Sequence, residues 1–402
     1  MRKDWEIKNL GEIGKPSMCK RILKSQTSST GEIPFYKIGT FGKKPDAFIS
    51  KEIYNEFRTK YSFPKKGDIL ISASGTIGRR VRYDGKPAFF QDSNIVWIDN
   101  DEKQVLNDYL YIFYEFCDWQ PSKGATISRL YNSDLTSIKI AFPKTHSEQK
   151  EIILILNDAF ESIELAKSNA KQNLKNAKEL FESYLKNIFN TNQAGWISST
   201  IGETCNLQTG GTPSTSKKEY YDGGLIKWLV SGDINQKVID DCEGRITEVG
   251  MKNSNTKYLP VNSVLIALNG QGKTRGTVAM LRTIATCNQS LVSIFPKNEK
   301  ELLPELVFSN LEGRYEEIRK MTGDGGNDRR GLNMPLIRSI KFSYPKSIST
   351  QKEVIKKLDL LRSEIKKLEF VYHQKLNDLE ELKKSILQKA FNGELKTSKI
   401  SA

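Results

Sequence analysis

The run Gln149-Lys150-Glu151-Ile152-Ile153 returns as Gln351-Lys352-Glu353-Val354-Ile355, at a spacing of 202 residues. The same spacing continues without a gap to two later pairs, Leu185 with Leu387 and Phe189 with Phe391. Similarity at one fixed spacing indicates a structural unit that occurs twice in the chain. We therefore expect two copies of one long element.

The repeat also extends upstream, but there its spacing changes. Residues 137–139 match 339–341 at 202 residues, residues 68–71 match 264–267 at 196, and Trp5 matches Trp196 at 191. A changing spacing requires insertions or deletions. The two globular segments that precede the repeated elements have therefore diverged from each other, whereas the elements themselves have kept their length.

Both copies of the long element show the pattern of an amphipathic helix, with apolar residues every three or four positions. The stripes run from Ile152 to Ile188 and from Val354 to Ala390, without proline or glycine. We expect six residues in a helix-helix seam: Leu156, Ile163, Leu174, Leu358, Ile365 and Leu376. The same pattern adds Leu180 or Phe181, Tyr184, Leu361, Leu368 and Leu382.

A helix about 60 Å long with one apolar stripe needs a partner. Either each helix packs on its own globular segment, or the two helices pair; the length of the stripes favours pairing. Chain order then requires an antiparallel pair, with the segments at opposite ends and the chain termini near each other. Thr350 and Glu353 fit a capping box for the second helix, and Gly393 fits its terminator.

The composition restricts the class of protein. The start of the chain lacks a signal peptide, and its longest aliphatic run, 152–156, is too short to cross a membrane, so we expect a cytoplasmic protein. The cysteines are scattered, with only His146 and His373 as imidazole partners. We expect buried free thiols rather than a metal site or disulfides at these cysteines: Cys19, Cys117, Cys205, Cys242 and Cys287.

The formal net charge of +14 favours a polyanionic partner, although a solvated lysine-rich surface is an alternative. Residues 147–190 carry six lysines and seven acidic residues, and residues 349–394 carry ten basic and eight acidic residues. With the two tail lysines set aside, +11 remains for the globular segments. The basic charge therefore lies in these segments, which indicates that they contact nucleic acid.

The globular segments alternate short β-rich runs with polar loops, and each contains one helix-like stretch, at 105–116 and 302–319. We interpret them as α+β domains. Loops rich in glycine, hydroxyl and basic residues suit contacts to phosphates and bases, although each alone could be a plain turn. The candidate DNA-binding residues are Ser74, Thr76, Arg79, Arg80, Lys123, Thr126, Arg129, Gln271, Lys273, Arg275, Asn327, Arg329 and Arg330.

Ala267 to Thr274 fits a relaxed phosphate-loop pattern, which would make the chain a DNA-dependent ATPase. That loop needs a helix beginning at Lys273, whereas Arg275 to Val278 is typical of a strand. A coiled-coil protein that binds DNA without sequence preference is a further alternative. The chain has no Pro-Pro pair, which excludes the N-P-P-Y type of methyltransferase motif.

Two variable segments that alternate with two near-identical helices resemble the specificity (HsdS) subunits of type I restriction-modification systems. The motifs that carry the resemblance are Phe142-Pro143 through Glu148-Gln149-Lys150, Tyr344-Pro345 through Gln351-Lys352-Glu353, and the run from Gly67 to Ser72. One departure is Thr350, where the family usually has a glutamate before the glutamine.

The resemblance implies a non-catalytic subunit that reads a bipartite double-stranded DNA target, with the helices as a ruler between the half-sites. It implies two modification subunits that methylate adenine with S-adenosylmethionine, and restriction subunits that use ATP and magnesium. This chain itself is expected to bind no cofactor and no metal, and to have no membrane partner.

The predicted fold is α+β, with two mixed α/β target recognition domains separated by two long antiparallel coiled-coil helices in a pseudo-two-fold repeat. The expected boundaries are segment 1 (residues 1–145), a central helix (146–190), segment 2 (191–348), a C-terminal helix (349–394) and a tail (395–402).

Overall fold

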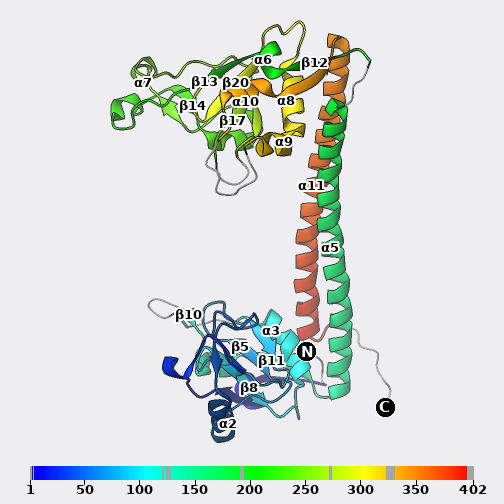
Figure 1. The fold of residues 1–402 in the computed structure, drawn as a ribbon. Helices are drawn as coiled ribbons and strands as arrows, with labels where there is room; N and C mark the ends of the chain where they lie inside the picture. Colours follow the sequence, from blue (N-terminus) through cyan, green and yellow to red (C-terminus); the bar gives the residue numbers. More distant parts are fainter. Residues whose placement is uncertain are drawn as a thin grey trace. The chain divides into compact units, whose positions relative to one another are not determined.

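The computed structural model describes residues 2, 4–119, 122–123, 128–190, 194–270, 274–322 and 331–395. The chain forms two compact units, which Figure 1 shows as a ribbon. Unit 1 combines Met1–Ala170 with Gln374–Ala402, and unit 2 is Lys171–His373. Each unit holds one globular segment and parts of both long helices. Among the described residues, no helix is apolar over a length that could span a bilayer.

Segment 1 is built on an antiparallel sheet of order β2-β8-β5-β6 and a mixed sheet of order β4-β3-β7. All four residues of β5 are buried, as in a strand that is covered on both faces. The strands are β2 (Gly14–Met18), β3 (Ile33–Tyr36), β4 (Phe48–Ile49), β5 (Ile69–Ser72), β6 (Arg80–Arg82), β7 (Phe89–Phe90) and β8 (Ile95–Asn100).

Helix α3 (Asn107–Phe116) contributes Tyr109, Leu110 and Phe113 to the buried core of segment 1. Helix α2 (Lys51–Lys60) begins at Ser50, whose hydroxyl accepts a hydrogen bond from the N–H of Ile53 at 3.3 Å. The shorter elements are α1 (Leu10–Ile13), α4 (Asn132–Ser137), the 3-10 turn Lys24–Gln26, and the hairpin strands β9 (Ser122–Lys123) and β10 (Ser128–Arg129).

Segment 2 repeats this plan with sheets of order β13-β20-β17-β18-β15 and β16-β14-β19. The β-rich runs at 264–267 and 291–296 form β17 (Val264–Ala267) and β20 (Leu291–Pro296). The other strands are β13 (Cys205–Thr209), β14 (Ile226–Leu229), β15 (Val238–Ile239), β16 (Arg245–Ile246), β18 (Val278–Leu281) and β19 (Thr286–Cys287).

The helix predicted over 302–319 is in fact two helices, α8 (Pro304–Gly313) and α9 (Tyr315–Lys320). They are separated at Arg314, whose φ of −110° departs from helical geometry. Pro304 suits the first turn of α8, where a backbone N–H has no helical partner. The shorter helices are α6 (Ile201–Thr204), α7 (Glu248–Lys252), α10 (Met334–Ser339) and the 3-10 turns Lys218–Tyr220 and Ser231–Gln236.

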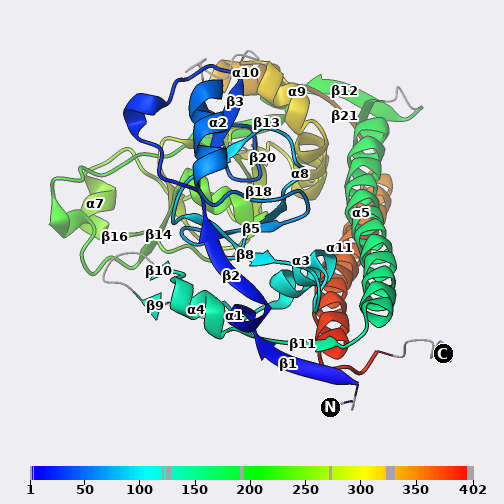
Figure 2. The same ribbon diagram turned by 90° about the horizontal axis from the view of Figure 1, so that it is seen from below.

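A two-stranded ribbon leads into each long helix, and the two ribbons have the same register. Strand β1 (Trp5–Asn9) pairs with β11 (Lys139–Pro143), with Trp5 opposite Pro143 (Figure 2). Strand β12 (Trp196–Thr200) pairs with β21 (Lys341–Pro345), with Trp196 opposite Pro345. The internal repeat predicted from the sequence is thus confirmed in these ribbons. One predicted spacing is corrected: Ser72 pairs with Ile95 as Ala267 pairs with Leu291, so β5 and β17 are related by 195 residues and not by 196.

The long helices are α5 (His146–Asn190) and α11 (Ile348–Phe391). Thr350 lies inside α11, so the capping box predicted there is wrong. The helix has already begun at Ile348, because the N–H of Gln351 donates to the carbonyl of Ser347 at 3.0 Å. Gly393 has φ +75°, the left-handed conformation of a helix terminator, as predicted.

The two helices pack together in antiparallel orientation, as predicted. In unit 1 an ion pair joins Lys167 to Glu380 at 2.7 Å, and in unit 2 another joins Lys178 to Glu369 at 3.0 Å. The helix ends also enter the cores of the units: Leu387 and Phe391 in unit 1, Leu185 and Phe189 in unit 2.

Of the six expected seam residues, Leu156, Ile163 and Leu358 are buried, and Leu174, Ile365 and Leu376 are half-buried. Four others from the pattern are more than a third exposed, which corrects that part of the prediction: Tyr184, Leu361, Leu368 and Leu382. Of the alternatives Leu180 and Phe181, Leu180 is exposed and Phe181 is half-buried. Because the apolar residues are spaced by three or four, two adjacent residues of each turn are candidates for the seam. At these positions the less exposed residue is the neighbour of the predicted one: Phe181, Leu185, Arg362, Glu369 and Lys383.

Candidate nucleic-acid interface

In segment 1, three loops meet at the end of the sheet where β5 finishes and β8 begins. The backbone N–H of Ala73 donates to the carbonyl of Asn94 at 2.8 Å, and the N–H of Leu130 donates to the carbonyl of Ala73 at 2.9 Å. These bonds bring together three segments distant in sequence, which we name platform 1: residues 73–79, 91–94 and 128–130.

Polar side chains are fixed on platform 1 by further hydrogen bonds. The hydroxyl of Ser74 donates to the Asn94 side chain at 2.8 Å, and the Arg129 guanidinium donates to the carbonyl of Ser93 at 2.9 Å. Arg79 donates to the carbonyl of Phe41 at 3.0 Å. Hydroxyl, amide and guanidinium groups on an ordered loop are the groups that contact phosphates and base edges in DNA complexes.

Gly78 is required for the shape of this platform. Its φ of +81° lies in the left-handed region that favours glycine. A Cβ at this position would lie 2.1 Å from the indole nitrogen of Trp119, so the tryptophan ring closes directly against the glycine. The Trp119 ring therefore packs directly against Gly78 of platform 1.

Segment 2 builds an equivalent platform with the same backbone bonds. The N–H of Leu268 donates to the carbonyl of Ser290 at 2.8 Å, and the N–H of Leu332 donates to the carbonyl of Leu268 at 3.0 Å. Gly276, with φ +81°, donates to the carbonyl of Ala267 as Gly78 does to Ser72. We name as platform 2 the described residues 268–270, 274–277, 288–290 and 331–332.

The two platforms share their backbone but differ in their side chains. Ser74 of platform 1 corresponds in place to Asn269 in platform 2, and Asn94 corresponds to Ser290, whereas Thr76 and Thr274 are the same residue type. A common frame with different polar groups is suited to two different DNA sequences.

The candidate residues predicted from the sequence are distributed as follows. Platform 1 contains Ser74, Thr76, Arg79 and Arg129, and platform 2 contains Arg275. Lys123 belongs to strand β9, which pairs with β10 next to platform 1. Six further candidates lie outside the described residues: Thr126, Gln271, Lys273, Asn327, Arg329 and Arg330.

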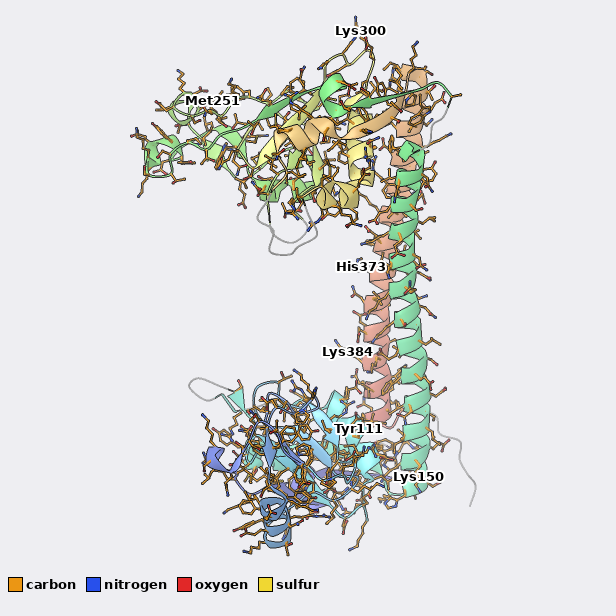
Figure 3. All side chains as sticks on the ribbon, viewed as in Figure 1. Tyr111, Lys150, Met251, Lys300, His373 and Lys384 are labelled. Carbon is orange, nitrogen blue, oxygen red and sulfur yellow. The ribbon has the colours of Figure 1, made fainter. Side chains whose placement is uncertain are left out.

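Arg80 points away from platform 1, toward helix α3. Its guanidinium donates to Glu115 at 2.6 Å and lies 4.4 Å from the ring centre of Tyr111. Tyr111, labelled in Figure 3, lies on the side of segment 1 next to α11. Lys383 of α11 donates to the other oxygen of Glu115 at 2.6 Å. Arg80 thus belongs to a charge cluster that fastens segment 1 to the long helices.

The corresponding cluster in unit 2 is centred on Glu312. Arg362 of α11 donates to the Glu312 carboxylate at 3.0 Å and lies over the ring of Phe308.

In unit 1, burial would raise the pKa of Glu115, but the hydrogen bond from Lys383 and the charge of Arg80 bring that pKa below its ordinary value. Both glutamates are therefore anchors for cations of α11.

Sequence reasoning missed the polar runs 91–94 and 288–290, which contribute to the platforms. Each run directly precedes a strand, β8 or β20, and the two runs are related by the upstream repeat. Their shared position before a strand in both copies was the sequence signal that could have identified these runs. Their role could not be read from composition, because only the backbone bonds to Ala73 and Leu268 bring them beside the other loops.

Two buried glutamines fix the beginning of each long helix. The side-chain oxygen of Gln149 accepts from the N–H of Leu106 at 2.9 Å, and its nitrogen donates to the carbonyls of Gln104 and Pro143 at 2.7 and 2.9 Å. Gln351 repeats all three bonds, at 2.9, 2.7 and 2.8 Å, to the residues Leu303, Glu301 and Pro345. The sequence identified these glutamines only as repeat markers.

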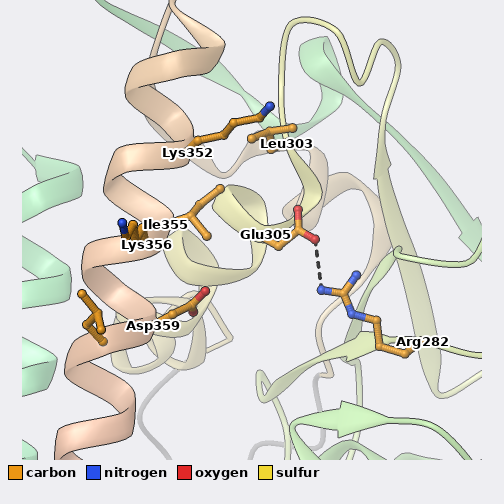
Figure 4. Close-up of a pocket in the computed structure, with 8 residues that line it drawn as sticks. Arg282, Leu303, Glu305, Lys352, Ile355, Lys356 and Asp359 are labelled. Atoms are coloured by element: carbon orange, nitrogen blue, oxygen red, sulfur yellow. Dashed lines mark hydrogen bonds and ion pairs between the residues drawn. The ribbon is translucent and has the colours of Figure 1, made fainter.

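Two other features of unit 2 are the segment of the phosphate-loop pattern and a groove beside α11. The described residues after the phosphate-loop pattern lead into strand β18, where a phosphate loop needs a helix. An open groove of about 650 Å³ lies between α11 and α8, with Lys352 and Lys356 on one wall and an Arg282–Glu305 ion pair at 3.0 Å on the other (Figure 4). The groove holds charges of both signs.

The family model for the type I restriction modification DNA specificity domain matches the chain twice, over residues 2–176 and 193–387. The chain belongs to this family. The chain is accordingly a DNA specificity subunit of a type I restriction-modification system, the non-catalytic kind of subunit. The resemblance and the fold class predicted from the sequence are both confirmed.

Several type I specificity subunits are similar to this chain. A putative specificity subunit of Haemophilus influenzae, S.HindORF215P, is 61% identical over 158 residues, which cover 39% of this chain and only 40% of that protein. The EcoR124I/EcoR124II specificity subunit of Escherichia coli is 26% identical over 316 residues, covering 76% of this chain and 75% of that one.

Two solved structures share the fold of this chain. The HsdS subunit from Thermoanaerobacter tengcongensis matches with a TM-score of 0.61 at 16% identity, covering 98% of each chain. A chain from a study of type I complex assembly and conformational transition matches with a TM-score of 0.76, also at 16% identity, covering 98% of this chain and 99% of that chain.

Proposed function

We propose that segments 1 and 2 each recognise one half of a bipartite double-stranded DNA target, through platforms 1 and 2. The observation that carries this proposal is the backbone frame built twice with different polar side chains. Because the frames match, both segments can approach DNA in the same way. Because the side chains differ, the two half-sites should differ in sequence.

The candidate DNA-binding residues take separate roles in this proposal. Ser74, Thr76 and Arg129 would contact bases or phosphates directly, as would Arg275 in platform 2. Arg80 would act indirectly, because its ion pair with Glu115 orients strand β6. The six candidates that lie outside the described residues stay predictions from the sequence for the same kind of contact.

The chemistry in this proposal belongs to partner subunits. Two modification subunits would methylate adenine with S-adenosylmethionine, and restriction subunits would use ATP and Mg²⁺. The described residues contain no cluster of three or more metal-ligating side chains. A subunit that directs enzymes to cellular DNA would work in the cytoplasm, as expected from the sequence.

The test is a genome-wide map of methylated adenines in cells that carry the partner genes, with and without the gene for this chain. We expect one bipartite motif that appears only when the gene is present. Ser74→Ala with Arg129→Ala should relax the motif at one half and leave the other half unchanged. Lys86→Ala, an exposed change in a turn away from platform 1, is the control. Unchanged motifs in all strains would refute the proposal.

A further inference from the structure

The two ion pairs between the long helices lie at positions that the 202-residue repeat relates to each other. In unit 1 Lys167 pairs with Glu380 at 2.7 Å, and in unit 2 Lys178 pairs with Glu369 at 3.0 Å. The 202-residue repeat carries Lys167 onto Glu369 and Lys178 onto Glu380. At both repeat-related positions, α5 has the cation and α11 has the anion.

The Lys167–Glu380 ion pair in unit 1 is well placed to stabilise the contact between α5 and α11. The Lys167 side chain is only 7% exposed, and its ammonium group also lies 3.0 Å from Glu164. The hydrogen bond to Glu380 raises the pKa of Lys167, and the same bond lowers the pKa of Glu380. Charge-assisted hydrogen bonds of this kind are stronger than neutral ones.

A second pattern, between cations and aromatic rings, has the same asymmetry. The Lys383 ammonium lies 4.9 Å from the ring centre of Phe160 in unit 1, and the Arg362 guanidinium lies 6.0 Å from that of Phe181 in unit 2. The repeat carries Phe160 onto Arg362 and Phe181 onto Lys383. Again α5 supplies one kind of group and α11 supplies its complement.

Side-chain size differs between the helices in a similar way. Ala170 and Ala177 of α5 correspond through the repeat to Tyr372 and Leu379 of α11. Ala170 is buried and the other three are half-buried. The seam thus has small residues on one helix and large residues on the other, which favours pairing of unlike helices.

We propose that this pattern makes α5 selective for α11 and rejects pairing of two copies of the chain through like helices. In an antiparallel pair of two α5 helices, Lys167 would face Lys178 of the other copy. In a pair of two α11 helices, Glu369 would face Glu380, and Arg362 would face Lys383. Like charges at these contacts destabilise the wrong pairs, which is how specific helix pairs exclude competitors.

The test uses the intact chain with a protease site inserted between residues 190 and 194 and cleaved after folding. Cleavage removes the covalent link that would otherwise favour pairing within one chain. Two preparations with different N-terminal tags are mixed, and recovery of both tags on one resin reports pairing of two α5 helices. For the natural sequence we expect background recovery.

The informative variant is Lys178→Glu with Glu369→Lys. It keeps the contacts between α5 and α11 complementary, but it places a lysine opposite a glutamate when two α5 helices pair. We expect recovery of both tags to rise about tenfold. Two like-charge contacts between the α5 helices and two between the α11 helices of the two copies become contacts between opposite charges. The matched control adds Lys167→Glu and Glu380→Lys, which restores like charges between two α5 helices, and should return recovery to background.

Background recovery for the two-site variant, or equal recovery for the two-site and four-site variants, would overturn the proposal. Folding is checked separately from the melting temperature of the uncleaved chain. Lys178→Glu alone should lower it, and Glu369→Lys added to that variant should restore it. A failure of this rescue would also count against the proposal, since positions 178 and 369 would then not be paired.

Discussion

Gln149 and Gln351, 202 residues apart, are both fully buried and make the same three hydrogen bonds to the backbone of their own globular segments. Each glutamine lies in the first turn of a long helix. The direction in which each helix leaves its segment is therefore fixed by the same polar contact. Neither amide can be replaced by an apolar group without leaving buried backbone groups unpaired.

Replacement of Gln149 by leucine leaves buried backbone N–H and C=O groups without partners. It should lower the free energy of unfolding by up to about 1–3 kcal/mol for each of these groups. Chemical denaturation followed by circular dichroism measures the change. Gln388→Leu, at an exposed position of α11, is the control and should be nearly neutral. Equal effects of the two changes would show that the buried amide does not fix the helix.

The anchor at Glu115 predicts a dependence of stability on pH. Its pKa in the folded chain is below the ordinary value of 4.5, so the ionised carboxylate stabilises the fold above about pH 4.5 and this contribution is lost as the pH falls through the folded-state pKa. Glu115→Gln should cost about 1–3 kcal/mol at neutral pH and nothing in acid. Denaturation at a series of pH values measures the difference.

Glu56→Gln is the control for this prediction, because Glu56 pairs with Lys60 at the surface of α2. Exposed ion pairs contribute little to stability, so this variant should follow the natural protein at every pH. A pH-independent effect of Glu115→Gln would mean that its charge is not responsible.

Gly78→Ala should distort platform 1 and weaken DNA binding. The new methyl group would meet the Trp119 indole, and alanine disfavours a φ of +81°. We expect a loss of stability of about 1–3 kcal/mol and weaker binding of one half-site in a binding assay with the assembled complex. Gly39→Ala has open space around it and should bind normally. Normal DNA binding by both variants would show that platform 1 is not needed for recognition of the half-site.

The expectation that the long helices act as a ruler between the half-sites predicts sensitivity to the length of the DNA spacer. One added base pair rotates one half-site by about a tenth of a turn relative to the other, so both segments can no longer engage together. Affinity of the assembled complex for DNA with lengthened and natural spacers tests this. A spacer of natural length but altered sequence should bind normally, and indifference to length would contradict a rigid ruler.

The repeat made much of the fold predictable from sequence. It gave the two long helices, their antiparallel pairing and the α+β segments, because apolar spacing and chain order constrain these features strongly. It failed for seam positions such as Leu361 and Leu368, since an apolar residue beside the seam has the same spacing as one within it. Arg362 and Glu369 occupy inward positions because partners on the other elements neutralise them.

The candidate site was less predictable. Glycine-rich loops indicated Ser74, Thr76 and Arg129, but they also indicated Arg80, whose guanidinium turns toward Glu115. The direction of a side chain on a short strand depends on which face the sheet buries, and this is decided by tertiary packing. The polar run 91–94 was overlooked for the same reason, because its role depends on a contact with a distant loop.

The discontinuous make-up of unit 1 affects how the chain folds as it is synthesised. Trp5 packs against Gly393, and Phe391 stacks on Phe116, so segment 1 is finished by residues that leave the ribosome after all of segment 2. Unit 2 is one uninterrupted stretch and can close earlier. A nascent chain that stops before Phe391 would keep an aromatic patch of segment 1 exposed, and chaperones or proteases would act on it.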